Sequence, residues 1–322
     1  MLNKRILSIP IWLWAVVFLL LALGFAIGPV GKSVLSRIGV DVTFPDWLSI
    51  PRPAPRLPAE AVFHIFGFPI TNSVLGAWFT VAVLTVLSYM VTRKMKLVPG
   101  RLQIAFESLV GWVYDFCKRV AGEKNGRRFF PVVATIFLFV SFNAWLSLMP
   151  GFGSITIATG EGHPAHLLRG ANTDINMPLA LAVISFVIVW YFGLKALGIK
   201  FLSQFFNVGP LLSSLAQILS GKVKAGLNGL VTGAIMVFVG LLELLSQFIR
   251  ILSFTFRLFG NMTAGEILLI SAAFLLPYVV ELPFYILELL VGLVQALIFS
   301  GLTLVFLTLA VAGHGEASEA HH

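Results

Sequence analysis

Charged residues are scarce in this chain. They make up 11% of its 322 residues, whereas hydrophobic residues make up 58%. Ordinary soluble domains contain about 25% charged and roughly 45–50% apolar residues. The shortage of charge excludes a soluble globular domain and predicts an integral membrane protein.

Cysteine and the common catalytic motifs are also missing or rare. The single cysteine, Cys117, excludes a disulfide within the chain. The sequence contains no H-E-x-x-H or G-x-S-x-G motif. The segment "AIGPVGKS", Ala26 to Ser33, fits a loose phosphate-loop pattern, but it ends an apolar run and does not follow a strand. We therefore expect no catalytic site, no cofactor and no metal centre.

The net charge of +8 comes from short basic clusters between apolar runs. Such clusters mark the cytoplasmic ends of membrane spans under the positive-inside rule. The segment "RKMK", Arg93 to Lys96, is one of them, and Lys195 with Lys200 forms another. The positive charge therefore indicates topology and not a nucleic-acid-binding surface.

Apolar runs of about 20 residues predict membrane spans. Ile11 to Gly28 is expected to be a retained anchor, with a cleaved signal peptide as the alternative. The proline-rich segment Asp41 to Ala61 predicts a helix-free external linker. Asn72 to Thr92 is the next span, and it ends on the cytoplasmic side. The chain thus divides into an N-terminal part, residues 1–71, and a membrane domain, residues 72–322.

An amphipathic segment precedes the next two spans. Arg101 to Val120 alternates apolar and polar residues at helical spacing, which predicts an interfacial helix; a helix packed on a partner is the alternative. Phe129 to Met149 and Met177 to Leu194 are expected to cross the membrane, joined by an external loop. The cytoplasmic loop that follows is expected to continue to Lys224, and residues 211–227 have no assigned role.

Six full charges lie in the apolar region after residue 230: Glu243, Arg250, Arg257, Glu266, Glu281 and Glu288. Each costs about 2.5–3.5 kcal/mol at a bilayer centre, so each needs a partner, water or a function. At about 100° per residue, Glu243, Arg250 and Asn261 share a helical face with Arg257, and Glu266 lies roughly opposite. No acid lies three or four residues from Arg257, so no local salt bridge is expected.

The last helix carries a second polar stripe. Glu281, Glu288 and Gln295 recur every seven residues and therefore share one face. Together with Glu266 they are expected to line a partial aqueous path, as proton acceptors, proton donors or water anchors. The alternative is that these groups pair only to hold helices together.

Four segments carry a family resemblance. The segment "SFTFRLFGNMTAGEILL", with "LLE" fourteen residues before its arginine, and "LVQALIFSGLTLVFLTLA" closely resemble subunit a of F-type ATP synthases. The segments "ANTDINMPLALAV" and "VPGRLQIAFESLVGWVYD" are also similar to that family. The resemblance extends from about Asn72 to Ala312.

The resemblance implies a non-catalytic stator subunit whose two offset half-channels carry protons to and from the carboxylates of a c-ring. Arg257 would be the essential stator arginine. The remaining ion-translocation residues would be Glu243, Asn261, Glu266, Glu288 and Gln295. Some relatives place a histidine and an acid at the positions of Glu266 and Glu288; two neighbouring acids would tend to share a proton.

The resemblance also implies partners and a location. The expected partners are the c-subunit ring, b-type peripheral stalk subunits, other ATP synthase subunits and the lipid bilayer, with no nucleic acid. The expected location is a bacterial plasma (inner) membrane, with an energy-transducing organelle membrane as the alternative. Proton and sodium both stay open as the coupling ion, because the ring supplies the ion-binding site.

The expected fold is an all-α polytopic membrane protein with one interfacial helix and two long, tilted C-terminal helices that form a hairpin against the ring. Pro277 and Pro283 mark the turn of that hairpin. Hydropathy alone also allows two crossings between Gly226 and Val280. The resemblance instead implies one helix of about 45–50 residues, too long to stand upright in a layer about 30 Å thick.

Three rival classes fit the sequence less well. A secondary transporter would usually show paired broken helices from an internal repeat. An intramembrane enzyme would need a nucleophile or a metal constellation. A purely structural subunit would not need the isolated charge of Arg257.

Overall fold

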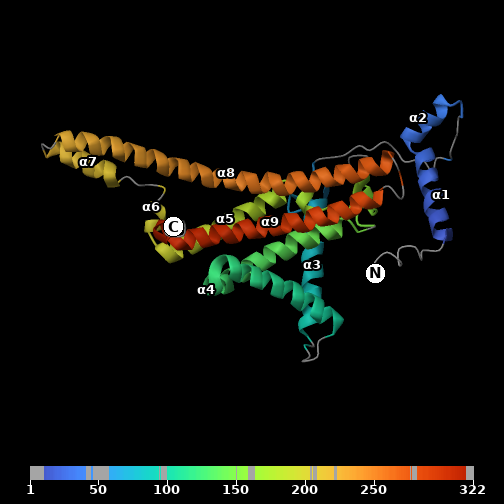
Figure 1. Ribbon diagram of the computed structural model, residues 1–322, viewed down its shortest axis with the longest axis horizontal. Helices are drawn as coiled ribbons and strands as arrows, with labels where there is room; N and C mark the ends of the chain where they lie inside the picture. The colour runs from blue at the N-terminus through green and yellow to red at the C-terminus, as the bar shows by residue number, and fades with distance from the viewer. Residues whose placement is uncertain are drawn as a thin grey trace. The chain divides into compact units, whose positions relative to one another are not determined.

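The computed structural model describes residues 11–40, 45, 58–93, 95, 100–149, 151–158, 164–203, 205, 209–220, 223–275, 277 and 281–316. Helices dominate these residues (Figure 1). The long ones are α1 (Ile11–Ile27), α3 (Asn72–Thr92), α4 (Arg101–Ser147), α5 (Asn176–Leu197), α8 (Val223–Leu275) and α9 (Glu281–Glu316). Among the described residues, five helices are long and apolar enough to cross a membrane, or six if α1 and the short α2 count as one bent span. The expected helical, polytopic membrane protein is confirmed.

The predicted span Asn72 to Thr92 agrees with the structure, and the segment predicted as an N-terminal anchor is helical. Helix α3 has the predicted bounds, Asn72–Thr92. Helix α1 ends at Ile27, and α2 (Pro29–Arg37) leaves it at 76°. Proline suits the first turn of a helix, where its missing N–H is not needed. The predicted linker from Asp41 to Ala61 lies almost wholly outside the described residues.

Helix α4 joins two segments that the sequence predicts separately. Gly122 interrupts it with φ 76° and ψ 169°. This left-handed φ favours glycine, because a side chain would collide with the backbone there. The break falls between the predicted interfacial helix, Arg101 to Val120, and the predicted span that follows. The position of the first part at a membrane surface stays a prediction.

The two C-terminal helices are as long as the family resemblance implies. Helix α8 is 53 residues long and unbroken, which at 1.5 Å per residue corresponds to about 80 Å. The single-helix prediction is confirmed, and the division into two crossings is wrong. Helix α8 ends just before Pro277, and α9 carries Pro283 in its first turn, as the predicted hairpin requires. The tilt of α8 in a membrane stays a prediction.

The cytoplasmic loop expected to run to Lys224 contains structure that we did not predict. It includes α6 (Lys200–Ser203) and α7 (Gly209–Leu219), and α8 already begins at Val223. Helix α7 lies along the start of α8, where Ser214 and Leu211 contact Gly229 and Gly233. The absence of side chains at these two glycines lets the helices approach.

Two short hairpins, which the sequence did not predict, lie between the predicted spans. Strands β1 (Ala61–Ile65) and β2 (Phe68–Thr71) pair antiparallel directly before α3. Strands β3 (Thr156–Ala158) and β4 (Pro164–His166) pair in the same way before the 3-10 helix η3 (Ala171–Thr173). Strands β3 and β4 have three residues each, which is below the length of about 4–8 residues over which sequence alternation is a useful signal.

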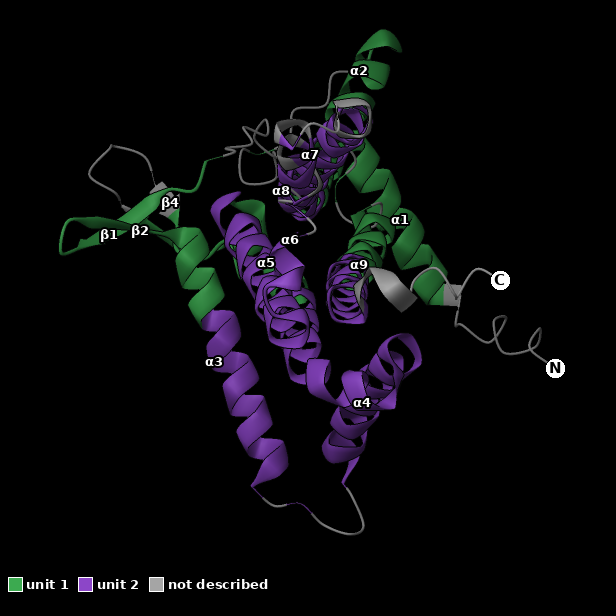
Figure 2. Ribbon diagram, turned by 90° about the vertical axis from the view of Figure 1, so that its left-hand side faces the viewer, with its two compact units in different colours: residues 1–78, 143–174, 260–294 green, residues 79–142, 175–259, 295–322 purple. Residues whose placement is uncertain are grey.

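The described residues form two compact units (Figure 2). Unit 1 comprises residues 1–78, 143–174 and 260–294, and unit 2 comprises residues 79–142, 175–259 and 295–322. The chain passes from one to the other within α3, α4, α8 and α9, and between Asp174 and Ile175. The boundary expected between residues 71 and 72 is a different division, and it stays a prediction.

Each unit has its own core. In unit 1, the Ser73 hydroxyl donates a hydrogen bond of 2.7 Å to the buried carboxylate of Asp174, which ties the start of α3 to the segment after η3. In unit 2, Trp190 stacks on Phe205 with ring centroids 5.2 Å apart, and Phe201 meets the same indole edge-on. The polar core of unit 1 positions the side chains described next.

An unbroken α8 makes a topological prediction. A chain that lacks Cys117 and carries cysteine at Ser318 should react with a membrane-impermeant thiol reagent only from the cytoplasmic side, the side of Arg93 to Lys96. The reason is that α8 then crosses the membrane once and α9 returns the chain. Labelling of oriented vesicles checks this, and reaction only from the outer side would reject it.

Candidate functional site

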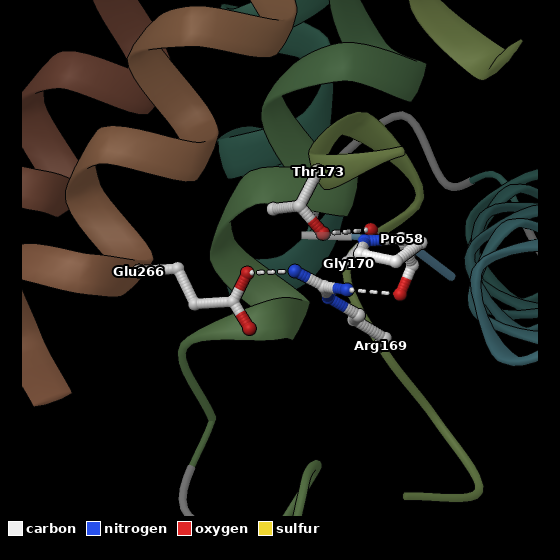
Figure 3. A network of polar contacts seen from close by, with 5 residues as sticks. All are labelled: Pro58, Arg169, Gly170, Thr173 and Glu266. Atoms are coloured by element: carbon white, nitrogen blue, oxygen red, sulfur yellow. Dashed lines mark hydrogen bonds and ion pairs between the residues drawn. The ribbon is translucent and has the colours of Figure 1, made fainter. Parts of the chain in front are cut away.

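In unit 1, Glu266 of α8 forms an ion pair with Arg169, which lies between β4 and η3. The Arg169 Nη2 atom is 2.8 Å from Glu266 Oε2, and the two side chains are 12% and 35% exposed. Figure 3 shows the guanidinium between this carboxylate and the carbonyl of Pro58, to which Nη1 donates at 3.3 Å. The sequence indicates Glu266 but not Arg169, which is 97 residues away.

The backbone around Arg169 is held by α3 and by its own turn. The Arg169 N–H donates to the carbonyl of Asn72 at 3.4 Å. The Arg169 carbonyl packs directly against Gly76, where a side chain would collide with it. The Thr173 hydroxyl donates to the carbonyl of Gly170 at 2.8 Å (Figure 3). The start of α3 therefore fixes the position from which Arg169 reaches Glu266.

Glu288 of α9 lies against α8 at the residue that precedes Glu266. Glu288 is 6% exposed, and its carboxylate occupies the space that a Cβ at Gly265 would need. No residue in the described part of the chain donates a hydrogen bond to this carboxylate. The structure thus brings Glu288 to the same turn of α8 as Glu266, but only Glu266 is paired. Sharing of a proton between the two stays a prediction.

Contacts between α4 and α9 hold the helix that carries Glu288. The indole Nε1 of Trp145 donates to the carbonyl of Leu289 at 3.1 Å. One turn further along, Gly292 packs against the methyl group of Ala144. These contacts set the position of the Glu288 backbone in unit 1.

In unit 2, a hydrogen-bonded chain runs along one face of α8. Gln247 Nε2 donates to Glu243 Oε1 at 3.3 Å, and Arg250 Nη1 donates to Gln247 Oε1 at 3.1 Å. The Arg250 guanidinium carbon lies 3.6 Å from the ring centre of Phe306 in α9. The predicted common face of Glu243 and Arg250 is consistent with this chain. Gln247 was not predicted, although it stands one turn after Glu243.

A small cavity adjoins this chain between α5, α8 and α9. Its volume is about 20 Å³, which is room for about one water molecule. Gln247, Arg250, Ser185 and Thr303 line it among apolar side chains. The Ser185 hydroxyl is buried and has no hydrogen-bond partner among the described residues. The cavity therefore offers polar contacts to a water molecule beside Arg250.

The remaining candidate residues lie as follows. Arg257 is half-buried in unit 2, and no hydrogen bond or ion pair joins it to another residue in the part of the chain that the structure describes. Gln295 is buried in α9 with 2% exposure. Asn261, in unit 1, is exposed on α8. Within the described ranges, no group of three or more His, Cys, Asp or Glu residues is suited to hold a metal ion.

Comparison with known proteins identifies relatives of the whole membrane region. A family model described as "ATP synthase A chain" matches residues 74–308. The chain is 30% identical over 250 residues to "ATP synthase subunit a" of Geotalea daltonii, covering 78% of this chain and 89% of that relative. It is 32% identical over 250 residues to "ATP synthase subunit a 3" of Pelobacter propionicus, with the same coverage.

The contact between Gly265 and Glu288 predicts a stability effect. Gly265→Ala should lower the free energy of unfolding by about 1–3 kcal/mol, because the added methyl group overlaps the buried carboxylate. Gly111→Ala in α4 is the matched control, since nothing lies within 4 Å of its new Cβ. Heat-induced loss of folded protein in detergent measures both, and equal stability of the two variants would contradict the contact.

Proposed function

The chain belongs to the ATP synthase A chain family, and from this premise we propose how its residues conduct protons. It is the stator subunit of the ATP synthase membrane sector, a multi-pass membrane protein that translocates ions and has no catalytic role of its own. We propose that residues 72–322 form the translocating domain. The bacterial source of both relatives supports the plasma membrane as its location.

The proposed partners are a ring of c subunits, b-type stalk subunits and the lipid around them. A rotary motor must load a proton onto a ring carboxylate from one side of the membrane and release it to the other. It must also prevent a direct leak between the two paths. Two half-channels that end at different heights, with a fixed cation between them, meet both requirements.

Arg257 is proposed as that fixed cation. The observation that supports it is a half-buried arginine, in a long apolar helix, that has no partner among the described residues. Charges about 4 Å apart attract by about 4 kcal/mol at an effective dielectric constant near 20. This attraction favours the ionised form of a passing carboxylate, and the positive charge repels a proton that would cross directly. Arginine suits the role because it stays protonated where lysine can lose its charge.

The outer half-channel is proposed to use Glu266 and Glu288, with Asn261 and Gln295 as further polar lining. The Arg169 ion pair neutralises Glu266 and fixes its orientation. Glu288 has no such partner among the described residues, so we assign proton exchange with water chiefly to Glu288. Arg169 acts as a positioning residue in this proposal, because it works through Glu266.

The inner half-channel is proposed to begin at Glu243. The hydrogen-bonded chain from Glu243 through Gln247 to Arg250 supports this, because it is a continuous polar path in an apolar region. The cavity beside Ser185 would hold a water molecule next to that path. The electrical driving force is about 2.3 kcal/mol per charge per 100 mV, so several protons are needed for each ATP.

Arg257→Ala should abolish proton-driven ATP synthesis while the complex still assembles. Arg257→Lys should be severely impaired, because both geometry and permanent charge change. ATP synthesis and ATP-driven pumping in membrane vesicles measure these effects, with the exposed Arg127→Ala as an active control. Near-normal pumping by Arg257→Ala would overturn the assigned role.

Arg169 and Glu266 should behave as a coupled pair. Arg169→Gln and Glu266→Gln should each reduce proton-driven ATP synthesis, and the double variant should lose less than the product of the two effects, because it leaves no unpaired charge. We expect coupling of about 1–3 kcal/mol, which corresponds to about 5–150-fold. Amounts of assembled complex are compared by immunoblot. A loss in the double variant equal to the product of the two single losses would show that the pair does not act as a unit.

A further inference from the structure

The turn of the β1–β2 hairpin contains a phenylalanine at an exposed position where a polar residue would fit the backbone conformation with less strain. Phe66 and Gly67 connect the strands, and both have positive φ, 50° and 84°. Two-residue turns with two positive φ values favour Asn-Gly, because bulky side chains crowd the backbone in this region. Phe66 is also 98% exposed. Neither turn geometry nor packing within the described chain explains an aromatic residue here.

One face of the hairpin is apolar throughout. The strands pair Phe63 with Ile70 and Ile65 with Phe68. Residues paired across an antiparallel ladder lie on the same face, and side chains alternate between faces along each strand, so these four side chains share one face. Phe63, Ile65 and Phe68 are 39%, 42% and 74% exposed. The intervening pair, His64 with Pro69, belongs to the opposite face.

The apolar face of the hairpin needs an apolar surface to pack against. An isolated two-stranded hairpin is marginally stable in water and depends on packing of its apolar side. Here the most exposed members are the aromatic residues at and beside the tip, Phe66 and Phe68. The working environment of the hairpin must therefore supply an apolar surface.

The connection to α3 identifies that surface. Strand β2 ends at Thr71 and α3, a candidate membrane span, begins at Asn72. Phe66 is thus six residues before the span, within about 20 Å even for a fully extended chain. Figure 2 shows the hairpin leaving the first turns of α3, which belong to the same unit, sideways and not along the helix axis. Where α3 crosses the membrane, this direction runs along the membrane surface.

We propose that the β1–β2 hairpin is an interfacial anchor that inserts its apolar face and Phe66 into the lipid headgroup region at the N-terminal end of α3. Phenylalanine suits this position, because interfacial elements bury faces rich in Trp, Phe and Leu at the boundary between headgroups and acyl chains. His64, on the other face, stays in water. The partner is the phospholipid bilayer itself.

The anchor is linked to the Arg169 ion pair through the base of the hairpin. The Asn72 N–H donates to the carbonyl of Glu60 at 3.0 Å, which closes the base of the hairpin. The carbonyl oxygen of Pro58, two residues earlier, accepts a hydrogen bond from the Arg169 guanidinium. A hairpin fixed in the interface therefore helps to fix the residue that holds Arg169, and through it Glu266.

Spin-label accessibility tests the anchor in the assembled ATP synthase complex, purified and reconstituted in phospholipid vesicles. A nitroxide is attached to cysteine in Phe66→Cys, and the matched control is His64→Cys on the opposite face. The parent complex, in which Cys117 is fully buried, gives the labelling background. Collision with oxygen reports lipid, and collision with a water-soluble nickel chelate reports water.

We expect the label at position 66 to be several-fold less accessible to the nickel chelate than the label at position 64, and more accessible to oxygen. Equal accessibility to the chelate at both positions would reject insertion. Shielding of position 66 from both reagents would also reject it, because another protein subunit would then cover the tip.

A second variant distinguishes the effect of the Phe66 aromatic ring from the effect of the turn conformation. With the label at Phe63→Cys, Phe66→Asn keeps a residue suited to positive φ but removes the aromatic ring. It should raise chelate accessibility at position 63 several-fold, whereas Phe66→Leu should change it little. Unchanged accessibility in Phe66→Asn would show that Phe66 is not the anchoring side chain. This outcome leaves the role of Arg257 untouched, so the two proposals fail separately.

Discussion

The free-energy cost of a charge in an apolar environment is the constraint on which the arrangement of α8 and α9 depends. It is about 2.5–3.5 kcal/mol per ionised group at a membrane centre, even on the lowest scales. A hydrogen bond to the amide of Gln247 and a contact with the ring face of Phe306 offset this cost for Arg250. An ion pair with Arg169 offsets it for Glu266. Arg257 has no such compensation among the described residues. This contrast within one helix is the observation on which the proposed role of Arg257 depends.

Small residues decide which polar groups can meet in these helices. Neighbouring helices ordinarily pack about 8–10 Å apart, with side chains filling the space between them. Gly265 leaves a gap in the surface of α8, and the Glu288 carboxylate fills it. Gly292, one turn along α9, lets the same helix approach Ala144. The burial of Glu288 therefore follows from two missing side chains as much as from its own position.

The sequence predicts the elements well where one strong local signal decides, and poorly where distant residues do. The apolar run that ends at "RKMK" determines α3 to the residue. Hydropathy alone could not decide whether α8 is continuous, because Arg250 and Arg257 interrupt its apolar run, and the family resemblance was needed. The helical period placed Glu243 and Arg250 on one face. Nothing local indicates Arg169, because its partner lies 97 residues away and its position depends on contacts with the start of α3.

Arg169 also changes what two neighbouring acids can do. Two carboxylates alone would carry two negative charges when ionised, and in an apolar region they would retain a proton between them. With Arg169 included, the group of three carries a net charge of −1 when both acids are ionised and becomes neutral when one proton binds. The Arg169 charge thus lowers the net charge of the fully ionised group from −2 to −1, which reduces the cost of ionising both acids. In the proposed outer half-channel the guanidinium contacts Glu266, so the exchanged proton is assigned to Glu288, whose carboxylate has no hydrogen-bond donor among the described residues.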